Sequence, residues 1–214
     1  MGGPLLVKLW GELACFTRPE LKVERVSYLV MTPSAARGAL EAIFWRPVFS
    51  WRIREIRVLR PPRFASMVRN EVTRKATMAS PPRPFYADDH RSQRHTLALR
   101  DVAYVIAADI VLRPQAGSGS LAAFRDQFRR RVRRGQCFQT PYLGCREFPA
   151  FFGPPEPGDA PVDSTEDLGA MLFDLDYSRD PESPRPIFFQ ARLDRGVMRP
   201  PQELYAKLSA PHVA

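Results

Sequence analysis

The first pattern along the chain is an alternation of apolar and polar side chains. It runs over residues 5–16, with Val7, Leu9 and Leu13 on one face and mostly charged or aromatic side chains between them. A period of two places the apolar set on one side of an extended backbone. We therefore predict a β-strand here, with one face in the core.

A helical period follows after a polar turn. Apolar residues recur at three- and four-residue spacing from Ala36 to Ile43. Thr32 can cap this helix through its side-chain oxygen, the proline after it suits the first helical position, and Pro47 ends it. Gly38 costs about 1 kcal/mol relative to alanine inside a helix, so we expect another segment to pass close to it.

A second strand pattern covers residues 49–59 and carries three arginines. Its alternation changes near Glu55, which indicates a bulge or a strand end. Residues 60–95 then contain five prolines and no sustained period. A stretch this long inside a domain is usually functional or disordered. Because it interleaves basic and aromatic residues, it could bind single-stranded RNA, or it could be a floppy insertion.

Strand and helix patterns return after residue 95. Residues 96–112 alternate as a strand, and a Gly-Ser stretch then opens a helix over residues 121–134, with Gly135 at its end. Gly117 and Gly119 could present backbone N–H groups to a phosphate, or the stretch could be a plain flexible loop.

The helix over residues 121–134 has the strongest charge pattern in the chain. Six arginines fall within ten residues, and Leu121, Phe124 and Phe128 are expected to form its buried side. A solvated helix face would normally mix charges of both signs, because like charges repel each other. We therefore expect nucleic-acid contact along the stripe formed by Arg125, Arg129 and Arg133.

The order of these elements predicts the fold class. Strand, helix and strand are followed by the long excursion and then by strand, helix and a further strand region over residues 136–152. This is the plan of an α+β fold with a ferredoxin-like βαββαβ core over residues 1–152, excursion 60–95 included. A Pro- and Gly-rich linker over 153–163 leads to a small C-terminal β subdomain over 164–214, with a tight turn at Asp194-Arg195-Gly196.

Charge narrows the choice of partner. The net charge is +9, and it is unevenly distributed: residues 1–155 hold 26 basic and 12 acidic side chains, whereas residues 156–214 hold 6 and 11. A basic body with an acidic end favours a polyanionic partner, most simply nucleic acid. Only four of the 32 basic residues are lysines, which fits phosphate recognition by arginine but also fits GC-rich coding.

Several classes of protein are disfavoured. No apolar run approaches the ~20 residues of a membrane span, and the N-terminus has no signal-peptide pattern. The cysteines Cys15, Cys137 and Cys145 are odd in number and widely spaced, so they indicate neither a zinc site nor a disulfide framework. We expect reduced thiols, mostly buried, in a cytoplasmic protein without membrane or cofactor.

Four ordered segments carry a family resemblance. They read FTRPELKVERVSY, TPSAARGALEAIFWRP, LRDVAYVIAA at 99–108 and YLGCREFPA at 142–150. The chain therefore resembles the fifth CRISPR-associated protein family in its subtype I-C form. The resemblance implies an RNA-recognition-motif-like core, a thumb-like excursion and binding of CRISPR repeat RNA. It also implies cleavage of that RNA and retention of the 5′ handle within a type I-C surveillance complex of several subunits.

The family's catalytic residues do not carry over. Some relatives use a tyrosine just before the Trp-Lys/Arg-Pro of the first helix, where this chain has Phe44. They also use a Lys-His pair near the start of the second helix, where residues 119–124 have neither residue. Either other groups do the chemistry, or cleavage is largely lost.

Cleavage of RNA without metal needs a base to take the 2′-hydroxyl proton and cations to stabilise the transition state. The candidate catalytic residues are His95, His90, Lys75 and Tyr86 in or beside the basic excursion. We predict no metal site. The acidic residues Asp174, Asp176 and Asp180 are interpreted as facing solvent or a protein partner.

The expected RNA-binding residues are mostly arginines on the two helices and the second strand. They are Arg37, Trp45, Arg46, Arg52, Arg54, Arg125, Arg129 and Arg133, with Gly117 and Gly119. Two other functions remain open at this point. One is a non-catalytic scaffold that only holds the RNA, and the other is a module that binds double-stranded DNA without sequence preference.

Overall fold

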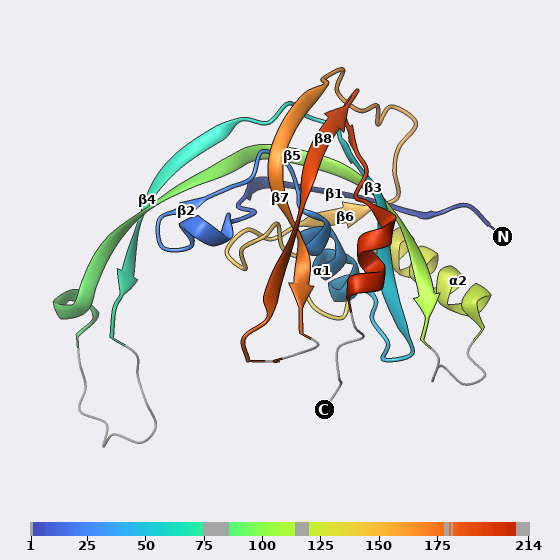
Figure 1. Ribbon diagram of the computed structural model, residues 1–214, viewed down its shortest axis with the longest axis horizontal. Coiled ribbons are helices and arrows are strands. Elements are labelled where there is room, and N and C mark those ends of the chain that lie inside the picture. Colours follow the sequence, from blue (N-terminus) through green and yellow to red (C-terminus); the bar gives the residue numbers. More distant parts are fainter. Residues whose placement is uncertain (1, 75–85, 114–119, 178–179, 181, 209–214) are drawn as a thin grey trace.

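The computed structural model describes residues 2–74, 86–113, 120–177, 180 and 182–208. Its central strand is β5 (Arg91–Leu112), which pairs antiparallel with β1 (Leu5–Ala14) on one edge and with β3 (Phe49–Val58) on the other. The path through the sheet is β6-β1-β5-β3-β9-β8-β7. The fold is thus mixed α and β, with a mostly antiparallel sheet and few helices (Figure 1).

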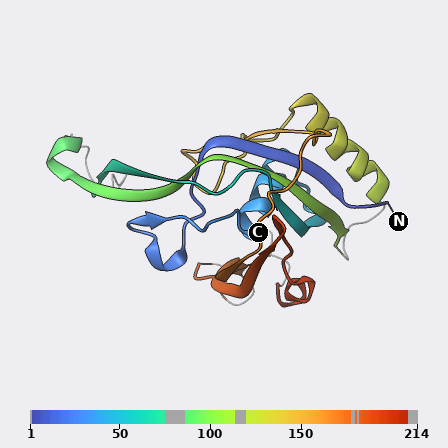
Figure 2. The same ribbon diagram turned by 90° about the horizontal axis from the view of Figure 1, so that it is seen from above.

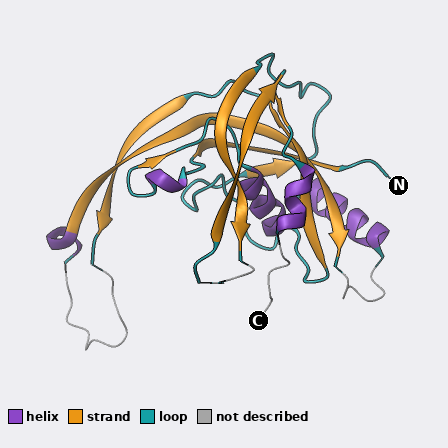
Figure 3. Ribbon diagram, viewed as in Figure 1, coloured by secondary structure: helices purple, strands orange, loops and turns teal. Residues whose placement is uncertain are grey.

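The N-terminal half of β5 leaves the body as an arm. It pairs antiparallel with β4 (Phe64–Val72) and, at its base, parallel with β2 (Arg25–Val26). The short 3-10 helix η2 (Ala87–His90) lies toward its tip (Figure 3). The prediction of an irregular stretch over 60–95 is therefore wrong for its described part, most of which is a two-stranded hairpin. Alternate β4 side chains are exposed and the others are only partly buried. The sequence therefore lacks the alternation of apolar and polar residues that marks a core strand.

Helix α1 (Pro33–Ile43) forms as predicted, with the Thr32 hydroxyl accepting a hydrogen bond from the backbone N–H of Ala35 at 3.2 Å. Its apolar face is buried. The expectation for Gly38 is wrong, since a Cβ added there would meet no atom within 4 Å. The glycine therefore leaves open space at the helix surface.

Helix α2 (Leu121–Arg134) ends at Gly135, whose φ of 63° is left-handed as a glycine cap requires. Its buried residues are Phe128 and Val132, whereas Leu121 is 40% exposed, which corrects the predicted buried side. Leu121 is the first residue of α2, and its side chain does not reach the core. Phe128 packs on Trp51 of β3 with ring centroids 4.7 Å apart.

The bulge predicted near Glu55 is confirmed, because the pairing of β3 with β5 shifts between Ile53 and Glu55. The strand expected over 136–152 is mostly wrong. Only β6 (Phe151–Gly153) forms there, together with an isolated bridge between Tyr142 and Pro149. The rest of that region is loop, anchored by backbone hydrogen bonds rather than by a ladder.

The C-terminal part adds a long hairpin to the sheet. Strands β7 (Glu166–Asp176) and β8 (Arg185–Asp194) pair with each other, and the short β9 (Val197–Met198) joins β8 to β3. The turn between β8 and β9 forms as predicted, and β7 packs on α1. Figure 2 shows this hairpin on the opposite side of the molecule from α2.

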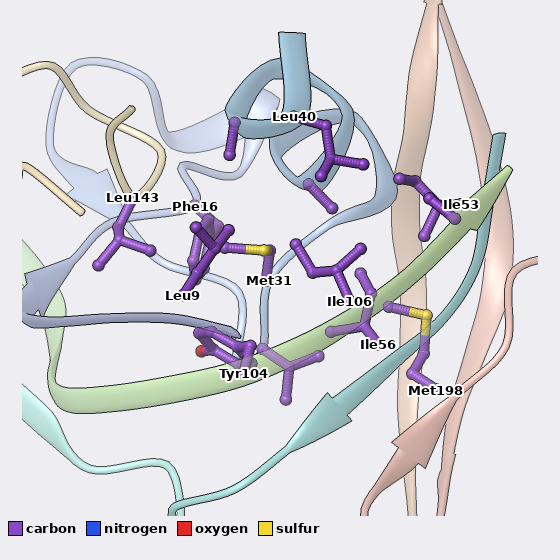
Figure 4. Close-up of a cluster of buried hydrophobic side chains, with 14 of the residues drawn as sticks. Leu9, Phe16, Met31, Leu40, Ile53, Ile56, Tyr104, Ile106, Leu143 and Met198 are labelled. Carbon is purple, nitrogen blue, oxygen red and sulfur yellow. The ribbon is translucent and has the colours of Figure 1, made fainter. Parts of the chain in front are cut away.

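The hydrophobic core lies between α1 and the sheet. Figure 4 shows side chains from β1, α1, β3 and β5 meeting there, among them Leu9, Leu40 and Ile106. Leu143, from the loop after α2, is fully buried in the same cluster. The chain also contains two further short 3-10 helices, η1 (Pro19–Leu21) and η3 (Gln202–Lys207). No helix among the described residues is long and apolar enough to cross a membrane.

Candidate nucleic-acid interface

The arginines of α2 lie on two sides of the helix. Arg131 points toward α1: its Nη1 donates to the carbonyl oxygen of Ile43 at 2.8 Å, and its guanidinium lies over the Phe44 ring at 5.2 Å. The stripe residues differ in their contacts. Arg125 donates to the carbonyl oxygen of Gly3, and Arg129 forms an exposed ion pair with Asp126 at 3.0 Å.

The remaining α2 arginines face outward. Arg130, Arg133 and Arg134 are all exposed, so the positive charge of the second half of the helix is accessible to a polyanion. An exposed ion pair such as Arg129–Asp126 contributes little to stability and gives way easily to a phosphate. The stripe can thus present Arg129 and Arg133 together, whereas Arg125 is engaged with the N-terminal segment.

The two faces of the arm differ. One face carries Phe64, Val68 and Val72, which are 43%, 54% and 48% exposed, with His95 paired opposite Val68. The other face carries an ion-pair network that ties the arm to the body. In it, Arg69 and Arg25 both contact Glu147, at 3.4 and 2.9 Å.

The structure separates the two candidate histidines. His95 lies in β5, and its backbone N–H donates to the carboxylate of Glu24. His90 ends η2 near the tip, where one ring nitrogen lies 3.5 Å from Nη1 of Arg74. Five residues of strand span about 17 Å, so the two rings cannot act on the same phosphate. Tyr86, the residue before η2, is 76% exposed, and Lys75 lies outside the described residues.

Arg37 of α1 is engaged within the protein. It donates from Nε and Nη2 to both carboxylate oxygens of Asp174, at 2.7 and 2.8 Å, and from Nη1 to Glu41. Burial opposes its charged form, yet the bonds to Asp174 hold the pKa of Arg37 above its usual value. Asp174 itself is only 4% exposed, which corrects the expectation that it faces solvent.

The arginines of β3 also have protein contacts. Arg54 donates to Asp109 at 2.5 Å and to Gln202 at 3.1 Å. Arg52 lies over the ring of Tyr205 at 5.7 Å and, with Arg37, lines an open cavity of about 440 Å³ between β3, α1 and β7. These side chains therefore offer less accessible charge than the α2 stripe.

Two exposed aromatic residues lie near the C-terminal end of α1. Trp45 is 42% exposed and is followed by exposed Arg46. Phe138, 82% exposed, is fixed nearby because its backbone N–H donates to the carbonyl oxygen of Ala42 at 2.9 Å. Sequence reasoning missed Phe138, since no periodic pattern marks this loop. Gly117 and Gly119 lie outside the described residues.

Phe44, which stands at the family's tyrosine position, contacts the start of α2, the region where the resemblance would place the Lys-His pair. The rings of Phe44 and Phe124 lie 6.4 Å apart, and Phe44 is buried against Phe49 and Arg131. Phe44 and the described start of α2, from Ser120 to Phe124, bring no titratable side chain to this contact. Within the described part of the chain, no three His, Cys, Asp or Glu side chains gather closely enough to hold a metal ion.

The comparisons with known proteins agree over most of the chain. A family model described as CRISPR-associated protein (Cas_Cas5) matches residues 4–201. The curated CRISPR pre-crRNA endoribonuclease Cas5d of Thermus thermophilus is 48% identical over 221 residues, covering 95% of this chain and 94% of that protein. The protein of the same name from Mannheimia succiniciproducens is 42% identical, covering 94% and 96%.

Solved structures show the same fold at lower identity. One described as a CRISPR-associated protein has a TM-score of 0.68 at 21% identity, covering 93% of this chain and 92% of its own. A functionally uncharacterized protein from Streptococcus mutans has a TM-score of 0.67 at 19% identity, covering 93% of each chain. A chain of a CRISPR RNA-guided surveillance complex has a TM-score of 0.53 at 15% identity, covering 87% of each. The family match and the two curated relatives show that this chain belongs to the Cas5d family of CRISPR-associated proteins.

Proposed function

We propose that the chain is a pre-crRNA endoribonuclease that cuts CRISPR repeat RNA and stays bound to the 5′ handle as a subunit of a type I-C surveillance complex. The observation that carries this proposal is the 48% identity, over 95% of the chain, to a protein with that name. The +9 net charge and the exposed arginines of α2 support an RNA partner. The place of action would be the cytoplasm.

We further propose that the core is ferredoxin-like. Strands β6, β1, β5 and β3 lie side by side in that order, all antiparallel, and α1 and α2 pack on the same apolar face. A βαββαβ chain whose first strand lies between the third and the fourth has this arrangement. On this proposal the arm is an insertion, 153–163 is a linker and 164–214 is an appended β subdomain.

The RNA would be held by positioning contacts. Exposed arginines on α2 meet phosphates without reading sequence, and Trp45, Arg46 and Phe138 offer stacking surfaces near the end of α1. The outward face of the arm adds Phe64 and the side chain of His95. RNA recognition of this kind joins stacking on aromatic rings to backbone contacts.

The proposed reaction is metal-independent. A base removes the proton from the 2′-hydroxyl, its oxygen attacks the adjacent phosphorus, and the 5′-oxygen of the next nucleotide leaves and takes up a proton. The products are a 2′,3′-cyclic phosphate and a 5′-hydroxyl. His95 is the proposed base, because its backbone is fixed in β5 while the residue remains exposed. Tyr86 and His90 lie in the distal arm and Lys75 lies outside the described residues; these three are the alternative catalytic candidates should His95 not be the base.

The test incubates the purified chain with end-labelled repeat RNA in EDTA. One parallel reaction contains Mg²⁺, and a control RNA carries a 2′-deoxy sugar at the cut site. Cleavage in EDTA of the normal RNA alone, leaving a cyclic phosphate, is the expected result. Cleavage only with Mg²⁺ would overturn metal independence. Tight binding without any cleavage would instead identify a scaffold, which Phe44 at the family's tyrosine position and the lack of a Lys-His pair over residues 119–124 would explain.

A further inference from the structure

Cys15 and Cys145, which are 130 positions apart, both place their sulfur atoms close to one hydroxyl group. Sγ of Cys15 lies 3.5 Å from Oγ1 of Thr17, and Sγ of Cys145 lies 3.8 Å from the same oxygen. Sγ of Cys145 also lies 3.5 Å from the carbonyl oxygen of Cys15. The end of β1 and the loop after α2 therefore hold the two thiols next to each other.

The backbone fixes this approach. The N–H of Cys15 donates to the carbonyl oxygen of Leu143 at 2.9 Å. Gly144 has a φ of 87°, and a Cβ on it would lie 2.1 Å from the carbonyl oxygen of Cys15. Only glycine allows the loop so close to β1. The proximity of the thiols is thus set by the main chain rather than by side-chain rotamers alone.

The two thiols differ in exposure and in charge. Cys15 is fully buried, whereas Cys145 is partly exposed, with Nη1 of Arg25 at 3.6 Å. The hydrogen bond from the Cys15 thiol lowers the pKa of Cys145 to about 6, and Thr17 and Arg25 act in the same direction, against burial and Glu147. That hydrogen bond, together with burial, raises the pKa of Cys15. Partial exposure and the nearby Arg25 make Cys145 the thiol that a small oxidant can reach, whereas Cys15 lies behind it in the core.

We propose that Cys145 is a peroxide-reactive thiol whose oxidised form Cys15 converts into a reversible intramolecular disulfide. The Cys145 thiolate attacks hydrogen peroxide, the O–O bond breaks, and the departing hydroxide takes up a proton to become water. The resulting sulfenic acid is attacked by the Cys15 sulfur, and its S–O bond breaks. The hydroxyl group leaves as water with the Cys15 proton. The two sulfurs give up two electrons, and one peroxide is reduced to two waters.

The disulfide would change the base of the arm. It fastens the loop over residues 141–150 to the end of β1 and removes the thiolate that faces Arg25. That arginine also contacts Glu147, which contacts Arg69 of β4. Oxidation therefore alters the ion-pair network between arm and body. A dithiol reductant reverses it by thiol exchange.

The test exposes the full-length chain to hydrogen peroxide at a few equivalents and then alkylates the remaining thiols. The expected product has lost two hydrogens, keeps one alkylated cysteine and yields a peptide pair joined through Cys15 and Cys145. A dithiol reductant should restore three alkylated cysteines. A product with Cys145 oxidised to sulfinic acid and Cys15 still alkylated would overturn the proposal, and so would a crosslink through Cys137. Because the readout is mass, the result does not depend on the endoribonuclease assignment.

Three variants sharpen this test. Cys137→Ser removes the exposed thiol and should form the same bridge as the parent. Cys15→Ser in the Cys137→Ser background should leave the Cys145 sulfenic acid unresolved, so a dimedone probe should label it several-fold more than in Cys137→Ser alone. Far-UV circular dichroism shows whether each variant folds. If Cys15→Ser does not fold, the peptide pair in the folded Cys137→Ser protein decides the question alone.

Discussion

Arg37 and Asp174 join helix α1 to strand β7 through two parallel hydrogen bonds, although 137 positions separate them. Both oxygens of the carboxylate accept, and Oδ1 also accepts from the backbone N–H of Leu175 at 2.8 Å. The carboxylate is almost fully buried, whereas 30% of the arginine side chain is exposed. The pair therefore attaches the C-terminal hairpin to the core through a desolvated contact.

Replacing Asp174 with asparagine should lower the free energy of unfolding by about 2–3 kcal/mol, because the partly buried guanidinium of Arg37 loses its buried, charged partner at nearly constant volume. Urea unfolding measures the change. Asp126→Asn is the matched control, since it breaks an exposed arginine pair on α2 and should cost less than about 0.5 kcal/mol. Equal stability of the two variants would contradict the role of Arg37–Asp174.

Local signals explain which elements the sequence predicted. Helix α1 follows from the Thr32 cap and the apolar period, and the end of α2 follows from Gly135. The bulge near Glu55 follows from a change in alternation. Each of these features depends on residues within a few positions of one another, so composition and spacing are sufficient to find it.

Nonlocal contacts explain what the sequence could not predict. The arm has water on much of both faces, so β4 has no hydrophobic alternation to mark it. The sequence predicts an accessible cation at Arg37, because its partner Asp174 lies far away in the chain, on β7. His90 and His95 are close in sequence yet far apart along an extended strand. The thiol pair, 130 positions apart, leaves no spacing pattern at all.

Two glycines should respond oppositely to alanine. Gly38→Ala should stabilise the chain by about 1 kcal/mol, because α1 is helical there and the new methyl group meets open space. Gly144→Ala should destabilise it by more than about 2 kcal/mol, since its φ is positive and the methyl group would collide with the Cys15 carbonyl. Thermal unfolding of both variants gives the signs. A stable Gly144→Ala protein would show that the loop can withdraw from β1.

The α2 stripe should control how strongly salt weakens RNA binding. Replacing Arg129 and Arg133 with glutamine should reduce the slope of log affinity against log salt by about 1.4, or about 0.7 for each lost phosphate contact on a single strand. Binding should weaken equally for repeat RNA and unrelated RNA. Arg57→Gln is the control, because Arg57 pairs with Glu55 within β3. An unchanged slope in the double variant would place the phosphates elsewhere.

Alanine variants of the two histidines should differ in their rates of single-turnover cleavage. His95→Ala should slow cleavage roughly 10²–10⁴-fold while RNA affinity stays within a few-fold, as expected for loss of a proton-transfer group. His90→Ala should cut at nearly the parent rate, because His90 lies about 17 Å further along the arm. The opposite ranking would move the site to the arm tip, beside Tyr86. Normal cleavage by both would remove the histidines from the mechanism.

The Cys145 thiol should react with iodoacetamide at unusually low pH. In the folded Cys137→Ser protein, alkylation of Cys145 should be half-maximal near pH 6, because its pKa is lowered to about 6. The same thiol in urea should be half-maximal near about pH 8.5, the value of a free cysteine. Since the folded-state pKa is the lower one, the thiolate's contribution to stability is present above about pH 8.5 and is lost as pH falls through about 6.

Cys15→Ala should move the folded-state midpoint upward, because the largest cause of the low pKa is the hydrogen bond from Cys15. An unchanged midpoint in that variant would transfer the effect to Thr17 and Arg25, and a midpoint near 8.5 in the parent would contradict the thiolate altogether.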